Sequence, residues 1–556
     1  MREPTQANRT NAHTTHKLGS PILTVLTRIS GSQADPIYYA YICRLDVKHL
    51  KTQLMNMNFT LLLKNGVALI YDNAKDEFHP VTTDVLIKDG IIESIEPGIV
   101  AREGCRVIDC SNKILSPGFV DTHNHHWESP LKGLYENLTA LSYFATMFTA
   151  STVFSAEDVF WATLAGCMQS IDCGTTTCLD YAHMSWSEDH GSQALAGTLS
   201  SGIRSVFAYA PAARLKLTEP DVTFKELLPE WFVSSLKNLA ALDIFQAPTT
   251  RVQLGLGFDF YFLGEKVVKD VFRLARSLDL KLVTSHWANL SGSDDPGLPE
   301  VMQNYGLLDD RIVLSHASGA SSKDCDIINK SQKWFISSSP SIEMTLRLGV
   351  PICFENGSVL QDSACSLGVD CHCLSSTSMI SEMRVALLAA RGLDARHKLR
   401  QGKVPSKVCR TAHDAFLMGT IRGARALGME NEIGTIAMGK RADVLIFDAV
   451  SPSMSPAAQL DPITAIVMHA GTGDIETVIV DGIVRKRDGR LLPVDLAKWD
   501  EKSRQLWQTQ QAVTWQDVSP RIADMQSRFA TNTKQFSLDK IKAAVAGLYG
   551  WSEITS

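Results

Sequence analysis

Three histidines stand within four residues in the stretch VDTHNHHWE, at positions 123, 125 and 126. The chain has only 15 histidines among 556 residues. About 0.4 His-x-His pairs are expected by chance at that composition, so the pair alone identifies no site. Residues two apart on an extended strand point to the same side. His123 and His125 can therefore share one metal ion, whereas His126 should point elsewhere.

Three further candidate ligands follow apolar segments that have the pattern of buried strands. His286 lies at the end of KLVTSHW, His316 at the end of RIVLSHA and Asp370 at the end of ACSLGVD. A single histidine at a strand end is more often a satisfied polar residue than a ligand. Several imidazoles and one carboxylate at the same end of a barrel instead indicate a divalent metal site. Zinc is the first expectation, with Fe(II) and Mn(II) as alternatives.

The elements that must position these residues alternate between strand-like and helix-like segments across residues 116–429. This alternation predicts an α/β fold, a (β/α)8 TIM barrel whose active residues meet at the C-terminal ends of its strands. The eight expected strands cover 118–125, 175–181, 204–210, 252–259, 281–287, 311–317, 333–339 and 364–370.

Two β-rich segments flank the expected barrel, at 58–115 and 430–492. Both contain Asn-Gly or Asp-Gly turns, which are typical of hairpins. We expect them to join as one small discontinuous β-sandwich domain. Residues 493–556 should form a C-terminal helical tail. Residues 1–57 are polar and poor in acids, which predicts a disordered or atypical extension and leaves organelle targeting open.

Bulk properties disfavour several classes of protein. A net charge of -6 disfavours nucleic-acid binding, and no run of about 20 apolar residues predicts a membrane span. Twelve cysteines without a regular framework favour a reducing compartment, the cytoplasm being the simplest. Cys371-His372-Cys373 lacks a second ligand pair and is interpreted as structural. The tail helices permit a homo-oligomer without requiring one.

The motifs resemble those of the amidohydrolase superfamily, in its cytosine-deaminase and chlorohydrolase-like branch. PGFVDTHNH resembles the strand-1 motif, and SLGVD followed by SEMRVALLAARG resembles the strand-8 segment. EIGTIAMGKRADVLIFD and VIVDGIVRKRDGRL resemble the C-terminal β-piece. The resemblance covers about residues 58–490, with the motifs in order at spacing compatible with a barrel.

The resemblance implies one metal ion, held by His123, His125, His286 and Asp370. It makes Asp370 and His316 the expected catalytic residues, with His316 contacting the substrate or the attacking water. The absence of a lysine at the end of LGLGFDFYF, where some bimetallic relatives carry a bridging one, favours a single metal.

One departure concerns the segment HWAN, which places Asn289 where deaminases of this branch carry a glutamate. An amide cannot serve as an acid or base. The missing glutamate makes deamination less expected and favours hydrolysis of a ring or side-chain amide, with a single aspartate carrying the protons. The expected substrate contacts are Glu128, His183, Trp127, Asn289 and Glu343. Of the aromatic residues Trp127, Trp186, Trp287 and Phe258, two should line a flat cavity.

The residues and the resemblance together imply a metal-dependent hydrolase of non-peptide carbon–nitrogen bonds in a small, cyclic or heteroaromatic substrate, acting through activated water. The same ligands could serve a decarboxylase or another lyase, which stays an alternative. A catalytically silent metal-binding relative is the third possibility.

Overall fold

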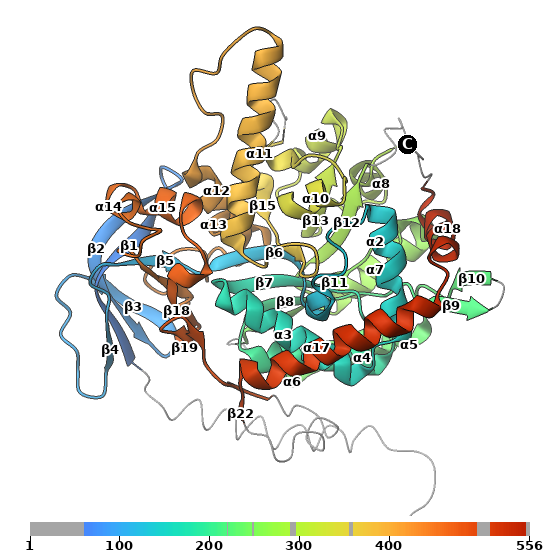
Figure 1. The fold of residues 1–556 in the computed structure, drawn as a ribbon, viewed down its shortest axis with the longest axis horizontal. Helices are drawn as coiled ribbons and strands as arrows, with labels where there is room; N and C mark the ends of the chain where they lie inside the picture. The colour runs from blue at the N-terminus through green and yellow to red at the C-terminus, as the bar shows by residue number, and fades with distance from the viewer. Residues whose placement is uncertain are drawn as a thin grey trace, which may run out of the picture. The chain divides into compact units, whose positions relative to one another are not determined.

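The chain is described from a computed structural model, shown as a ribbon in Figure 1. The predicted N-terminal extension, residues 1–57, lies outside the described residues. These cover 60–218, 221–246, 250–289, 296–354, 360–496 and 512–551.

The centre of the fold is a parallel sheet with every one of the eight predicted strands, whose ends differ from prediction by one or two residues. The eighth strand is divided into two short pieces. The strands are β6 Phe119–His125, β7 Thr175–Ala182, β8 Arg204–Tyr209, β11 Val252–Gly257, β12 Val283–Ala288, β13 Ile312–Ser318, β14 Trp334–Ser338, β15 Cys365–Leu367 and β16 Asp370–Cys371.

The sheet closes where β16 pairs with β6, with Asp370 opposite Asn124 and Cys371 opposite His125. Gly368, between β15 and β16, makes this approach possible. A Cβ atom at that position would lie 2.7 Å from the Cβ of His123. The result is a TIM-barrel-like α/β fold.

Helices cover the outside of the barrel, so strands such as β7 and β8 are buried along their whole length. Helix α7 presents one apolar face, since Val268, Val271, Phe272 and Ala275 recur at helical spacing and are buried. The covering helices include α3 Ala156–Asp172, α4 Glu188–Ser201, α5 Glu230–Ala240, α7 Glu265–Ser277, α8 Leu298–Asn304, α9 Ser322–Lys330, α10 Pro340–Thr345 and α11 Met379–Arg400.

The two β-rich flanks meet in a second sheet of nine strands, because β5 pairs antiparallel with β17. Figure 1 shows the blue N-terminal strands beside the orange-red C-terminal ones. The strands are β1 Thr60–Asp72, β2 Glu77–Lys88, β3 Ile91–Glu96, β4 Arg106–Asp109, β5 Lys113–Pro117, β17 Val444–Asp448, β18 Ile475–Val480, β19 Ile483–Arg487 and β20 Arg490–Leu491.

Shorter elements connect these parts, and no helix in the described ranges is both long and apolar enough to cross a bilayer. They include η1 His126–Leu131, α2 Ala140–Met147, η2 Phe148–Thr152, β9 Leu215–Thr218, β10 Asp221–Phe224, α6 Asp243–Gln246, η3 Tyr261–Leu263, α12 Ala412–Met418, α13 Ile421–Ala426, α14 Ala457–Leu460, α15 Pro462–Met468, β21 Val494–Asp495 and β22 Ala512–Val513.

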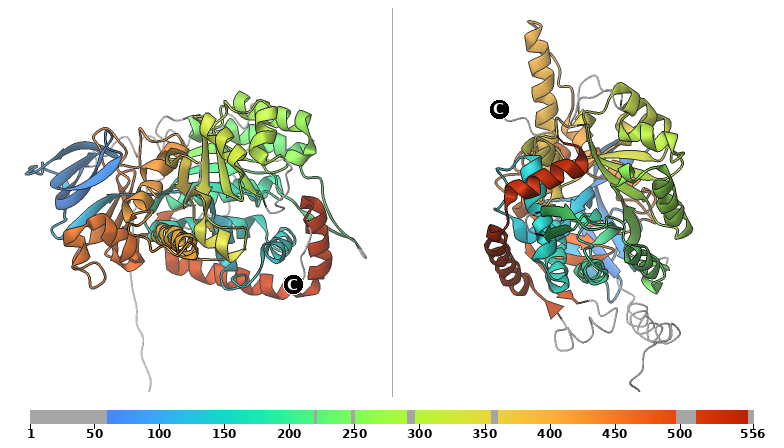
Figure 2. Two further views of the ribbon diagram at one scale, coloured as in Figure 1. Left: turned by 90° about the horizontal axis from the view of Figure 1, so that it is seen from above. Right: turned by 90° about the vertical axis from the view of Figure 1, so that its right-hand side faces the viewer.

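Two helices form the described end of the chain. Helix α17, Trp515–Asn532, runs beside α3, and α18, Leu538–Tyr549, packs against α2 (Figures 1 and 2). Phe529 of α17 is buried against Tyr135 and Phe154. The tail is therefore part of the barrel's outer layer.

A buried ion pair connects the barrel to the second sheet. Arg204, at the start of β8, donates from Nε and Nη2 to the two carboxylate oxygens of Asp443, at 2.9 and 3.1 Å. Its Nη2 also donates to Asp481, 3.2 Å away in the turn between β18 and β19. The Arg204 side chain is only 1% exposed, so this two-pronged contact lies in a nearly dry environment.

Replacing Arg204 by methionine should lower the free energy of unfolding by about 3–5 kcal/mol, because it leaves the Asp443 carboxylate buried without its counter-charge. Urea denaturation followed by circular dichroism measures the change. Arg273→Met is the control, since Arg273 has a 70% exposed side chain and its ion pair should contribute less than about 1 kcal/mol. Equal effects of the two substitutions would contradict the assignment.

Candidate metal centre and substrate cavity

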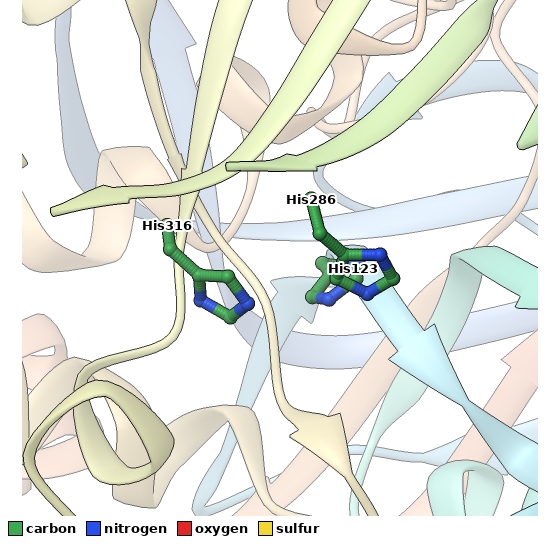
Figure 3. A group of neighbouring side chains, drawn as sticks. All are labelled: His123, His286 and His316. Carbon is green, nitrogen blue, oxygen red and sulfur yellow. The ribbon is translucent and has the colours of Figure 1, made fainter. Parts of the chain in front are cut away.

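The barrel brings the five expected metal and catalytic residues to the same end of its sheet. His123 and His125 end β6, His286 lies on β12 and His316 on β13, while Asp370 begins β16. The rings of His123, His286 and His316 extend into one space below the strand ends (Figure 3). Residues separated by almost 250 positions thus form one cluster.

The distances within this cluster are those of a shared binding site. Asp370 Oδ1 lies 3.2 Å from the Nε2 atoms of both His123 and His125. The Nε2 atom of His125 lies 3.1 Å from that of His286. His316 Nε2 lies 3.6 Å from the second oxygen of Asp370.

These side chains fit a divalent cation. Neither ring nitrogen of the fully buried His123 makes a hydrogen bond within the described part of the chain. Burial raises the pKa of Asp370, but the nearby His123 and His316 outweigh it and hold that pKa well below its usual value. An ionised carboxylate surrounded by imidazole nitrogens is the donor set that zinc and similar ions require.

Backbone strain occurs at the same residues. His316 and Asp370 have φ angles of 73° and 66°, in the left-handed region that few residues other than glycine adopt. Such conformations cost about 1–3 kcal/mol each and persist where the surrounding structure enforces them. Here they turn both side chains towards the cluster.

Outer contacts fix the orientation of two candidate ligands, His286 and His125. The Nδ1 atom of His286 lies 2.9 Å from Asp259 Oδ2, and its backbone N–H donates to the other oxygen of Asp259. The Nδ1 atom of His125 lies 2.9 Å from the carbonyl oxygen of Tyr181. A hydrogen bond at Nδ1 leaves Nε2 free to bind a metal.

Glu343 lies behind His316, so its expected role as a substrate contact is corrected. It is fully buried, accepts hydrogen bonds from Ser338 and from the backbone of Ser339, and lies 3.5 Å from His316 Nδ1. Burial lowers the pKa of His316, but Glu343 and Asp370 outweigh it and raise that pKa. Glu343 thus favours a charged imidazolium.

Glu128 is also fully buried and lies one layer behind the cavity, which corrects its expected role as a direct substrate contact. Tyr143 donates a hydrogen bond of 2.7 Å to one carboxylate oxygen, and the Cys373 thiol contacts the other at 3.1 Å. Burial raises the pKa of Glu128. The hydroxyl of Tyr143 also lies 3.1 Å from Cys371 Sγ, so the two cysteines predicted to be structural contact the site.

Trp127 supports His183 rather than contacting the cavity. Its side chain is fully buried, and its indole N–H donates to His183 Nδ1 at 2.9 Å. His183 in turn stacks on the ligand His125, with ring centroids 4.1 Å apart and planes 13° from parallel. Burial and the neighbouring His125 hold the pKa of His183 well below its usual value, which favours a neutral ring.

His126 turns away from the metal cluster, as its position past the His-x-His pair predicts. Its ring nitrogens lie 3.3 Å from Asp180 and 3.2 Å from Ser170. Asn289 follows β12, is half-buried, and donates its backbone N–H to the carbonyl of Ser318. It is not among the residues lining the cavity in the described part of the chain.

The metal cluster opens into a cavity of about 230 Å³. Its polar groups, including His125, His286 and Asp370, lie at one end, and no lysine or arginine lines it among the described residues. Of the four aromatic residues expected near it, two line it, Trp186 and Trp287, while Phe258 is buried against Tyr261. The other walls are mainly apolar: Phe144, Met147, Phe148, Pro211, Ala212, Ala213, Phe260, Leu346, Leu348, Tyr549 and Trp551.

Sequence reasoning missed several residues of this site. Asp259 stands in the expected fourth strand, and a carboxylate just past a barrel strand was a usable signal. Tyr143 and Tyr181 gave no such signal. Tyr143 comes from a loop helix and Tyr181 contributes a backbone carbonyl, and neither property has a distinctive motif.

The family assignment rests on the whole barrel. The sequence model of the amidohydrolase family matches residues 114–484, which is more than half of the chain. The chain belongs to the amidohydrolase family. The resemblance inferred from the motifs is confirmed, and the protein is a metal-dependent hydrolase of carbon–nitrogen bonds other than peptide bonds.

Two proteins similar in sequence to this amidohydrolase are named as deaminases. A 5-methylthioadenosine/S-adenosylhomocysteine deaminase of Acetivibrio thermocellus is 26% identical over 457 residues, covering 79% of this chain and 96% of its own. A 5'-deoxyadenosine deaminase of Methanobrevibacter smithii is 26% identical, covering 80% of this chain and 97% of its own. The alignments span nearly the full length of both enzymes.

Solved structures agree on the fold. An adenosine deaminase from Xanthomonas campestris with bound zinc superimposes with a TM-score of 0.67 at 17% identity, covering 85% of this chain and 98% of its own. An atrazine chlorohydrolase mutant from Arthrobacter aurescens, complexed with zinc and atraton, gives the same TM-score and identity, covering 84% of this chain and 100% of its own.

Replacing Asp259 by asparagine should weaken zinc binding by about 10- to 100-fold, because His286 loses the carboxylate that orients its ring. Competition with a fluorescent chelator measures the affinity. Asp270→Asn is the control, since Asp270 lies on the exposed face of α7. Unchanged zinc affinity in the Asp259 variant would show that the contact does not orient the ligand.

Proposed function

We propose that this amidohydrolase uses one divalent ion, zinc in the first instance, to hydrolyse a carbon–nitrogen bond of a small, uncharged ring compound. The observation that carries the proposal is the convergence of His123, His125, His286 and Asp370 around one position. When bound, the ion supplies Lewis-acid activation of water and lowers its pKa to about 7. The absence of a lysine after β11, where the chain has Asp259, supports a single ion.

Asp370 is the proposed proton carrier. It accepts a proton from the attacking water as the new carbon–oxygen bond forms, and delivers that proton to the nitrogen as the carbon–nitrogen bond breaks. Asn289 stands after β12 at the position where deaminases of this branch carry a glutamate. Asp370 therefore serves both proton transfers. The thiol of Cys371 lies 3.3 Å from Asp370 Oδ1 and helps to hold this oxygen in place.

We assign His316 to stabilising the negative charge that develops, during attack by water, on an atom attached to the reacting carbon. Its contact with Glu343 favours the charged ring, and a buried cation is most effective where charge develops in the transition state. Among the residues that the structure describes, His183 has no comparable carboxylate partner within hydrogen-bond distance, since Glu128 lies 3.9 Å away. We therefore assign His183 to substrate positioning, with its ring held by Trp127.

The cavity supports a substrate whose main body is a flat, apolar ring. Its polar atoms gather near Asp370, while aromatic and aliphatic side chains form the other walls. The relatives named above are deaminases of adenosine derivatives, so an aminated heterocycle is one candidate substrate. A cyclic amide or N-acyl compound is the other, and loss of the usual glutamate at Asn289 favours it.

The domain organisation is proposed with the same boundaries as the sequence predicts. Residues 58–115 and 430–492 form the small β-sandwich domain, supported by a separate cluster of buried apolar side chains such as Leu61 and Val444. Residues 116–429 form the barrel, and 493–556 the helical tail. No disulfide bond joins the cysteines in the described part of the chain, which supports a reducing compartment such as the cytoplasm.

Asp370→Asn should reduce kcat by about a thousandfold or more, because the amide neither binds the ion well nor carries protons. Product formation is measured on a panel of aminated heterocycles, cyclic amides and N-acyl compounds, with ammonia and carboxylate assayed separately. Circular dichroism checks folding, and Asp524→Asn, on an exposed part of α17, is the control. Near wild-type turnover would overturn the proposed role of Asp370.

Removal of the metal should abolish activity, and added zinc should restore it, because the ligands alone cannot activate water. Metal analysis of the purified protein is expected to find about one equivalent per chain. Less than about half an equivalent in the active enzyme would contradict a mononuclear site, and two equivalents would contradict a single ion.

A further inference from the structure

One wall of the substrate cavity comes from the far C-terminal end of the described chain. Tyr549, the last residue of α18, and Trp551 both line the cavity, together with Phe144 of α2. The match to the amidohydrolase family model ends at residue 484, so this wall lies outside the matched segment. The wall is therefore a feature of this chain's tail.

The end of α18 is shaped to place the two rings side by side. Gly550 has a φ angle of 67°, the left-handed conformation that commonly ends a helix, and the N–H of Trp551 donates to the carbonyl of Ala546 at 2.9 Å. This turn folds Trp551 back onto the helix. Its ring stacks on Tyr549, with centroids 5.1 Å apart and planes 24° from parallel.

The pair is held against the barrel. Phe144 packs 5.5 Å from the Trp551 ring and 6.2 Å from the Tyr549 ring. Ile541 and Val545 of the same helix are buried. Burial and the negative charge of Asp259 both raise the pKa of the Tyr549 hydroxyl.

We propose that Tyr549 and Trp551 are specificity-determining residues that bind a second flat, apolar group of the substrate, separate from the group that carries the reacting bond. The inference rests on the proposed function and narrows the substrate class to ring compounds with an uncharged aromatic or alicyclic substituent. Stacked aromatic walls favour such groups, and no lysine or arginine lines the cavity in the described ranges to attract an anionic one.

The test uses the zinc-loaded full chain and three probes with the same metal-binding group: acetohydroxamic, benzohydroxamic and naphthohydroxamic acid. Titration calorimetry measures their affinities for the wild type and for Trp551→Ala. The variant should bind naphthohydroxamic acid at least about tenfold more weakly, because the ring loses a stacking partner. It should bind acetohydroxamic acid within about twofold of the wild type.

Two further variants separate recognition from structure. Trp551→Phe should recover most of the lost affinity, since it restores an aromatic surface. Leu538→Ala changes an exposed residue at the opposite end of α18 and should leave all three affinities unchanged. An equal loss for all probes, or no loss for the largest one, would overturn the proposal.

Failure of the metal site has a different signature. If the wild type bound no acetohydroxamic acid, the proposed metal chemistry would be refuted, independently of the wall. Naphthamide, which carries no hydroxamate, is titrated in parallel. A tenfold loss of its affinity in Trp551→Ala supports the wall in either case, and an unchanged affinity overturns it.

Discussion

The site depends on the pairing of β16 with β6, which closes the barrel. This pairing sets Asp370 opposite Asn124 and so brings the carboxylate within 3.2 Å of the ring nitrogens of His123 and His125. Gly368 permits the approach, because a side chain there would collide with His123. A carboxylate shared between imidazoles is favourable only with a cation or a proton between them, so barrel closure and metal binding support each other.

Around this cluster, two carboxylates act through histidines: Glu343 is fully buried and Asp259 is half-buried. Asp259 orients His286 and Glu343 lies beside His316, so each imidazole has one nitrogen directed to the cluster and one towards a supporting group. Buried charges in such pairs are costly unless they are matched. Their presence at the C-terminal ends of the strands, with φ angles above 60° at His316 and Asp370, marks this end of the barrel as the functional one.

The substrate side of the site is built from elements that are not part of the barrel core. Tyr143 and Phe144 come from a helix in the first connection, and Tyr549 and Trp551 come from the end of the tail. The barrel thus supplies the chemistry common to the family, and the connections and tail shape the cavity. This division explains how one metal-binding framework can serve different substrates.

The sequence alone determined the eight strands and the gathering of His123, His125, His286, His316 and Asp370 at their ends, because strand periodicity and strand-end position are local signals. Only the tertiary structure decided which polar residues reach the cavity. Glu128, Trp127 and Glu343 stand beside the motifs but are fully buried behind Tyr143, His183 and His316, whereas Tyr143 reaches the cavity from a connecting helix and Trp551 from the tail. The direction of a side chain and its second layer of contacts depend on packing between segments far apart in the chain, and no local pattern records that packing.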